Sequence, residues 1–180
     1  IAAPRVWPHD DLRHARPDGG ADFADKVVVM HDGRVVQMGT PEELFECPAH
    51  TFVGYFIGSP GMNLLPARVE GSVARIDGEE IPLGGHYRDL GGKVEIGIRP
   101  EYVRLSRDEG VPAQIRRVED VGRHRIVRAD VFGREIAIVV GEDEPVGADM
   151  TRVVFDPKRI IVYVDDWREA PIGNRQEEAA

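Results

Sequence analysis

Apolar and polar positions change their spacing along the chain, and each change indicates a different kind of element. Residues 27–30 form a continuous apolar run, which predicts a strand covered on both faces. Asp32-Gly33 follows, and a second largely apolar run occupies residues 34–38. We expect a β-hairpin here, because a tight two-residue turn needs positive φ at both central positions and Asp-Gly supplies it.

The pattern then becomes helical. Thr40 is placed to cap a helix, with Pro41 in its first turn and Glu43 completing a capping box. This helix should end near Cys47, before a proline. A second helix is expected from about Ala49 to Ile57.

Three aromatic residues of the second helix share one face at helical spacing, namely Phe52, Tyr55 and Phe56. The stripe predicts packing in a core instead of contact with a ligand. Cys47 is the one cysteine, so no intramolecular disulfide is possible, and a single cysteine is typically a small buried apolar residue.

From Asn63 onward the period is two, which predicts strands. Three pairs of segments flank a turn: Val73–Ile76 and Glu80–Leu83 flank Asp77-Gly78, Val127–Val131 and Ile136–Val140 flank Phe132-Gly133, and Val153–Phe155 and Ile160–Val164 flank residues 156–159. A single segment, Val94–Ile98, shows the same alternation. Short strands at such intervals predict a small β-barrel or sandwich. Gly58-Ser59-Pro60-Gly61 has the composition of a linker before this region.

Composition limits the classes of function. The 180 residues include 23 Lys and Arg against 32 Asp and Glu, a net charge of −9. This balance argues against a general nucleic-acid binder, which needs a basic surface to displace counterions. The longest apolar runs have the length of strands, and no run approaches the roughly 20 residues that span a bilayer. We expect a soluble, cytoplasmic protein that meets a membrane through a partner.

The chain offers no set of residues for catalysis. Its sequence contains no Gly-x-x-x-x-Gly-Lys-[Ser/Thr] phosphate loop. The six histidines and single cysteine lack the spacing of zinc ligands, and no nucleophile–base pair stands out. Glu42, Glu43 and Glu46 lie in a short helix, where capping and the helix macrodipole explain them better than a metal site does. We therefore expect no catalytic, cofactor or metal residues in this chain.

Three motifs occur together and in order. They are Ala24–Leu44 (ADKVVVMHDGRVVQMGTPEEL), Phe52–Asn63 (FVGYFIGSPGMN) and Gly97–Glu101 (GIRPE). The first resembles the last strands and helix of the nucleotide-binding domain of bacterial ABC importer ATPases of the carbohydrate-uptake class, such as the maltose-importer ATPase. The second resembles the passage into the regulatory domain of that family, and the third resembles a signature inside it. The resemblance covers about residues 21–167.

This resemblance implies a mainly β fold. A β-hairpin and two short helices, left from the end of an α/β ATPase domain, come first, and an OB-type β-barrel regulatory domain (transport-associated OB, or TOBE) follows them. Residues 1–20 are expected to be irregular or disordered, because prolines and glycines interrupt them and their charges show no period. The rest divides into 21–60, the end of the nucleotide-binding domain, 61–168, the regulatory domain, and 169–180, a tail. The resemblance also implies that ATP and Mg²⁺ are bound by the full-length parent, an ABC-type ATPase, and that this chain alone is inactive.

The resemblance implies a second ATPase subunit, whose regulatory domain packs against this one, and membrane permeases, which are contacted through the missing ATPase core. A periplasmic binding protein and a regulatory protein or metabolite are further implied partners, and nucleic acid is not. The location implied is the inner face of the cell membrane.

Arg99 and Glu101, on either side of Pro100, are spaced to point to one side of an extended chain. One interpretation is that Arg99 ties the turn together through a carboxylate or backbone carbonyls. The other is that the pair contributes to a dimer or ligand contact.

A second candidate surface is rich in arginine. Its members are Arg116, Arg117, Arg123, Arg125, Arg128 and Arg134. An anionic partner is one use of such a surface. A solvated strand face with cross-strand ion pairs is the other.

Three functional hypotheses follow. The first is a regulatory and dimerisation module of an ABC importer ATPase for a sugar or polyol. The second is a module that senses a small ligand, an oxyanion or a sugar. The third, an OB-type nucleic-acid binder, would need aromatic stacking platforms on a basic face.

Overall fold

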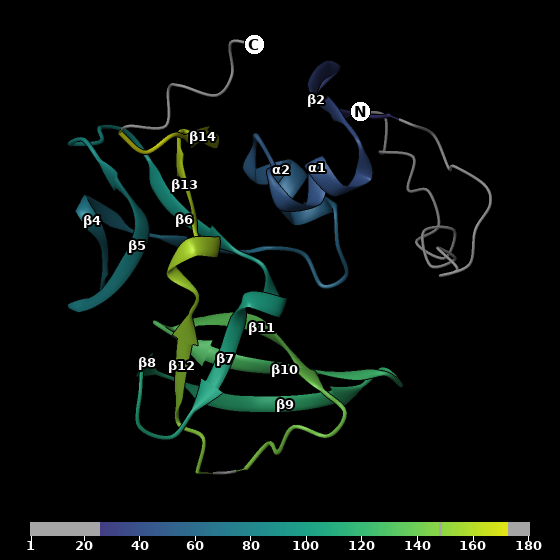
Figure 1. Ribbon diagram of the computed structural model, residues 1–180, viewed down its shortest axis with the longest axis vertical. Coiled ribbons are helices and arrows are strands. Elements are labelled where there is room, and N and C mark those ends of the chain that lie inside the picture. Colours follow the sequence, from purple (N-terminus) through teal and green to yellow (C-terminus); the bar gives the residue numbers. More distant parts are fainter. Residues whose placement is uncertain (1–25, 148, 173–180) are drawn as a thin grey trace.

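The structure, a computed structural model, describes residues 26–147 and 149–172 (Figure 1). The expectations for residues 1–20 and for most of the 169–180 tail lie outside the described residues. The N-terminal part consists of β1 (Val27–His31), β2 (Arg34–Gly39), α1 (Pro41–Glu46) and α2 (Thr51–Phe56). Within the described residues, no helix has the length and apolar character needed to cross a membrane.

The remaining elements are strands and two 3₁₀ turns, which confirms the mainly β prediction. In chain order they are β3 (Asn63–Pro66), β4 (Arg68–Ile76), β5 (Glu79–Tyr87), β6 (Val94–Ile98), η2 (Pro100–Tyr102), β7 (Val103–Ser106), β8 (Val111–Pro112), β9 (Gln114–Asp120), β10 (His124–Val131), β11 (Arg134–Gly141), β12 (Arg152–Phe155), η3 (Pro157–Arg159), β13 (Ile161–Val164) and β14 (Trp167–Glu169).

The predicted two-residue turns are confirmed. Asp32-Gly33, Asp77-Gly78 and Phe132-Gly133 join β1 to β2, β4 to β5 and β10 to β11, and both residues of each turn have positive φ. Such turns match the right-handed twist of the strands they join, so short sequence signals were sufficient to place three hairpins.

The capping box of α1 is also confirmed. The Thr40 hydroxyl accepts a hydrogen bond from the Glu43 N–H, and the Glu43 carboxylate accepts one from the Thr40 N–H. The second helix is shorter than predicted and begins at Thr51, because the His50 side chain caps it by accepting a hydrogen bond from the Phe52 N–H.

The strands pair within several separate sheets. In the upper part of Figure 1 these are β14-β13-β6-β3 and the β4–β5 hairpin, and in the lower part they are β11-β10-β9 and β7-β12-β8. The strands on either side of residues 156–159 therefore belong to different sheets, with η3 between them. One continuous cluster of buried apolar residues, from Leu65 to Val162, joins all these sheets.

Three expectations about burial are wrong. In the β1–β2 hairpin Val29 is buried, whereas Val28 and Met30 are exposed, so only one face of this hairpin is covered. Tyr55 and Phe56 are 67 % and 53 % exposed and do not belong to the core. Cys47 is likewise exposed.

Asn63 joins the upper and lower groups of strands. Its side-chain amide donates to the Ala137 carbonyl and accepts from the Ala137 N–H, both at 2.8 Å, in a buried position. The side chain thus substitutes for a strand at this point of β11, because a buried peptide group needs both of its partners.

Replacement of Asn63 by Leu should lower the free energy of unfolding by about 2–4 kcal/mol, because it leaves the buried Ala137 N–H and carbonyl without partners. Urea denaturation followed by circular dichroism measures this change. As a control, Gln114→Leu on the exposed face of β9 should change stability by less than about 0.5 kcal/mol. If Asn63→Leu also changed the free energy of unfolding by less than about 0.5 kcal/mol, the two hydrogen bonds between Asn63 and Ala137 would not contribute to stability as argued.

Candidate functional site

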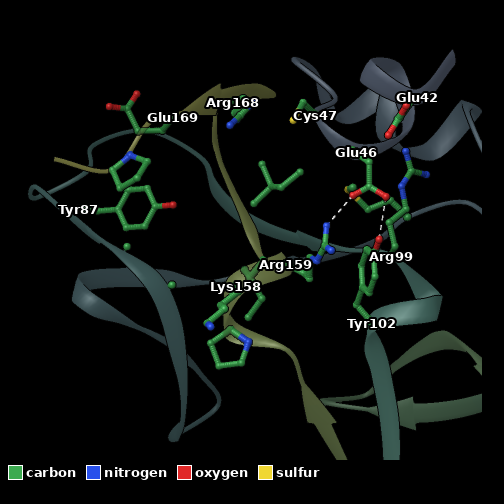
Figure 2. A pocket seen from close by; sticks show the side chains of 17 residues that line it. Glu42, Glu46, Cys47, Tyr87, Arg99, Tyr102, Lys158, Arg159, Arg168 and Glu169 are labelled. Carbon is green, nitrogen blue, oxygen red and sulfur yellow. Dashed lines mark hydrogen bonds and ion pairs between the residues drawn. The ribbon is translucent and has the colours of Figure 1, made fainter. Parts of the chain in front are cut away.

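A groove of about 530 Å³ lies between helix α1 and the strands of the following region (Figure 2). Glu46 and Cys47 at the end of α1 form one wall. The opposite wall comes from β5, η3 and β14, which contribute Tyr87, Lys158 and Arg168. Arg99 and Tyr102 also line the groove, on the side of Glu46 (Figure 2).

The Arg99 side chain is 2 % exposed and binds the carboxyl ends of both helices. Its Nε and Nη2 donate to the Phe45 carbonyl at 3.1 and 2.8 Å. Its Nη1 donates to the Gly54 carbonyl at 2.7 Å and also to the Ile57 carbonyl. The guanidinium lies 4.1 Å from the centroid of the Phe45 ring. One side chain thus satisfies carbonyls that helix termini leave without a partner, and adds a cation–π contact.

Burial lowers the pKa of Arg99, opposed mainly by the carboxylate of Glu101. The guanidinium is nevertheless charged at every accessible pH. Partial negative charge at the carboxyl ends of α1 and α2 compensates this buried cation. The contacts agree with the interpretation that Arg99 binds backbone carbonyls.

The expectation that Arg99 and Glu101 point to the same side is wrong. Pro100 begins the 3₁₀ turn η2 instead of continuing an extended strand. The turn carries Glu101 to the exposed surface, while Arg99 stays buried.

Glu46 is held by two residues that are distant in sequence. Tyr102 Oη donates to Glu46 Oε1 at 2.8 Å, and Arg159 Nη1 donates to Oε2 at 2.8 Å (Figure 2). The Arg159 guanidinium also lies 4.6 Å from the centroid of the Tyr102 ring. Burial and the hydrogen bond to Glu46 raise the pKa of Tyr102, so this phenol remains a donor at neutral pH. We call Glu46, Tyr102 and Arg159 the clasp.

A third contact between the helices and the strands lies beyond β13. Asp166 Oδ1 accepts hydrogen bonds from Thr51 Oγ1 at 3.2 Å and from Lys93 Nζ at 3.0 Å. Lys93 also lies 2.8 Å from Glu95, and these hydrogen bonds raise its pKa to about 12. The bond from Lys93 lowers the pKa of Asp166, which therefore remains ionised near neutral pH.

The structure places the six predicted arginines away from the groove. Arg116 lies 3.1 Å from Asp130, and both Arg117 and Arg128 approach Glu119, at 2.8 and 3.5 Å. This agrees with the ion-paired strand face, whose exposed pairs contribute little stability each.

Three of the six arginines make no such ion pair with the residues that the structure describes. Arg125 donates to the carbonyls of Gly141, Glu142 and Glu144 at the end of β11. Arg123 and Arg134 have no acidic side chain within 4.0 Å among the residues that the structure describes. Binding of an anionic partner remains a prediction for these two.

Sequence reasoning missed the clasp. It assigned Glu46 to the capping of α1, whereas Glu43 caps the helix and Glu46 binds Tyr102 and Arg159. The partners lie 56 and 113 positions further along the chain. No local spacing signals such a contact.

In the described part of the chain, no three His, Cys, Asp or Glu side chains are grouped as metal ligands would be.

Two family models match the chain in succession. Residues 58–103 match the MalK OB fold domain, and residues 96–162 match the TOBE domain. The predicted OB-type fold is therefore confirmed. The two matches include Arg99, Tyr102 and Arg159, whereas Glu46 lies before them.

Curated relatives match over the same part of the chain. The ABC transporter ATP-binding protein y4oS of Sinorhizobium fredii is 44 % identical over 66 % of this chain and 33 % of its own length. UgpC 2 of Agrobacterium fabrum and UgpC of Escherichia coli K12, sn-glycerol-3-phosphate import ATP-binding proteins, are 42 % and 40 % identical over 67 % and 68 % of this chain. The matched segments make up 34 % and 36 % of those proteins. The chain thus spans about a third of the length of these relatives.

Replacement of Arg99 by Met should release α1 and α2 from the strands and lower stability by about 2–4 kcal/mol, because the carbonyls of both helices lose a buried donor. Amide hydrogen exchange measures the effect, with faster exchange expected in α1 and α2 before β10 and β11. Arg134→Met, at an exposed position of β11, is the control. Unchanged protection of the helices in Arg99→Met would contradict this role.

Protonation of His50 should weaken the start of α2, because its Nδ1 accepts a hydrogen bond from the Phe52 N–H at 3.0 Å. Burial lowers the pKa of His50, the charge of Asp166 opposes this, and His31 lowers the pKa further. The folded-state pKa therefore lies below the unfolded value of about 6.5. The unfolded chain gains the proton first as the pH falls, so this stabilisation is full above about pH 6.5 and decreases below it.

Comparison of the chain with a His50→Asn variant tests this pH dependence, because Asn caps a helix without titrating. Melting temperatures between pH 7.5 and 5 should show the original chain losing stability relative to the variant as the pH falls. Parallel profiles for the two proteins would exclude His50 as a titrating cap.

Proposed function

We propose that this chain, the C-terminal regulatory part of an ATP-binding subunit of the ABC importer family, supports ATP-driven uptake of a sugar or polyol by the subunit to which it belongs. The observation that carries the proposal is the succession of the MalK OB fold domain and the TOBE domain over residues 58–162. Two of the relatives are sn-glycerol-3-phosphate import proteins, which favours a polyol or its phosphate as cargo.

The contacts between the helices and the strands support a regulatory role. Arg99, the clasp and the Asp166 hydrogen bonds join α1 and α2 to the OB and TOBE strands at three separate places. Helices held in this way move together with the regulatory strands. A partner that binds the regulatory strands differently in two states of the transporter therefore shifts the balance between those states.

The uncovered face of the β1–β2 hairpin supports attachment to an ATP-binding core. Val28 pairs with Met38 and Met30 pairs with Val35, and all four of these side chains are exposed. A two-stranded sheet is marginally stable alone, and contiguous exposed apolar side chains indicate a surface that another structure covers. In this proposal the nucleotide-binding core covers it.

ATP chemistry belongs to that core in the proposed assignment. ATP and Mg²⁺ bind there, and the chain of 180 residues, which contains no phosphate loop, neither binds nor hydrolyses ATP. The proposed partners are a second ATP-binding subunit, which the regulatory strands help to hold, and membrane permeases contacted by the core. The complex then lies on the cytoplasmic face of the membrane.

A chimera tests the proposal. Residues 26–172 replace the matching segment of Escherichia coli UgpC. The hybrid is expressed in cells that lack their own UgpC. We expect uptake of sn-glycerol-3-phosphate within about tenfold of the natural protein, because the two proteins are 40 % identical over 128 residues. The same hybrid carrying Arg99→Met should transport less, because its helices are no longer tied to the regulatory strands.

Two results would overturn the proposal. One is a hybrid that folds and dimerises but supports no more uptake than the control, which is UgpC without its C-terminal segment. The other is a saturable, Mg²⁺-dependent thermal shift of the isolated chain with ATP, which would place the nucleotide site in these 180 residues.

A further inference from the structure

We propose that the groove of Figure 2 binds a small hydroxylated anion, such as a polyol phosphate, through Tyr87, Lys158 and Arg168. This inference extends the proposed function by assigning a ligand site to the regulatory part. It depends on the groove alone and is testable on the isolated chain.

Tyr87 gives the first argument. Its side chain is 6 % exposed, yet its hydroxyl makes no hydrogen bond with any residue that the structure describes. Figure 2 shows this hydroxyl directed into the groove from β5. The ring packs in the core, whereas the hydroxyl oxygen faces the groove, where it can donate to or accept from a ligand.

Two cations line the same groove. Among the described residues, neither Lys158 nor Arg168 has a carboxylate within 4.0 Å. Burial raises the pKa of Tyr87, the charge of Arg168 opposes this rise, and the carboxylate of Glu169 adds to it. Arg159 and Arg99, in contrast, are engaged by Glu46 and by backbone carbonyls.

The groove walls are fixed in place. A side chain at Gly84 would put its Cβ 2.8 Å from the Pro157 carbonyl oxygen, so glycine lets η3, and with it Lys158, pack against β5. Arg168 of β14 pairs with Tyr163 of β13, and the Arg168 backbone N–H donates to the Ala49 carbonyl at 2.9 Å. A ligand therefore meets donors whose backbones are already held.

The charges select the class of ligand. Ammonium and guanidinium groups bind phosphate and carboxylate oxygens, and a phenol donates to the same oxygens. Glu42 also lines the groove, and it is a hydrogen-bond acceptor for hydroxyl groups of a ligand. Glu169 points away from the interior (Figure 2). The volume of about 530 Å³ suits a molecule of the size of a polyol phosphate.

The ligand would contact both α1 and the regulatory strands. Its binding would therefore stabilise the arrangement in which the clasp is closed, because Glu46 of the clasp and the proposed donors line the same groove. By linkage, the ligand shifts the balance toward any transporter state in which this arrangement is kept.

Isothermal titration calorimetry of the chain tests the site with four probes: sn-glycerol-3-phosphate, gluconate, inorganic phosphate and glycerol. We expect binding of the first two, weaker binding of inorganic phosphate, and no binding of glycerol. Tyr87→Phe and Arg168→Gln should each weaken binding by at least about tenfold, because each removes one donor and leaves the fold intact. Arg134→Gln, far from the groove, should leave the affinity unchanged.

The outcomes are separable from those of the uptake experiment. Binding of glycerol as tight as that of its phosphate would show that charge does not select the ligand and would overturn the proposal. Equal affinities of Arg168→Gln and the original chain would also overturn it, as would no binding of either anionic polyol at 10 mM. A hybrid that transports normally while the chain binds none of the probes would remove the ligand site and leave the transport assignment in place.

Discussion

The rest of the structure depends on the burial of one guanidinium. Arg99 reaches from the end of β6 to the carboxyl ends of α1 and α2, and its donors are matched to carbonyls of Phe45, Gly54 and Ile57. A buried charge is tolerated when hydrogen bonds replace its hydration, and here four bonds to carbonyls at the helix termini do so and the helix dipoles add compensation. This requirement fixes the position of the helices against the strands, and it thereby creates the groove between them.

The groove combines two kinds of polar contact that serve different purposes. The clasp is saturated, because both oxygens of Glu46 are occupied and Arg159 lies over the Tyr102 ring. The side chains of Tyr87, Lys158 and Arg168 line the rest of the groove, and among the described residues no hydrogen bond or ion pair engages them. Saturated networks make a structure rigid, whereas unsatisfied groups at the rim of a cavity are suited to binding. The same groove thus contains a structural part and a part suited to a ligand.

The residues that contradicted expectation have a common physical explanation. Val28, Met30, Tyr55 and Phe56 have the apolar pattern of core residues, but they are exposed in this chain. Periodicity reports that a side chain is suited to burial, and does not state which segment buries it. In the proposed function, an ATP-binding core would cover the exposed face of the hairpin.

The sequence by itself determined the local structure: the turns at Asp32-Gly33 and Asp77-Gly78, the capping box at Thr40 and the mainly β class. Each depends on the φ preference or side-chain reach of a few neighbouring residues. Tertiary structure alone decided that Glu46 meets Arg159, that Asn63 replaces a strand beside Ala137, and that Tyr87 faces a groove. These contacts join residues 74 to 113 positions apart or depend on how two elements pack. Charge and polarity at one position do not specify a partner so distant in the chain, because the packing of the strands and helices selects it.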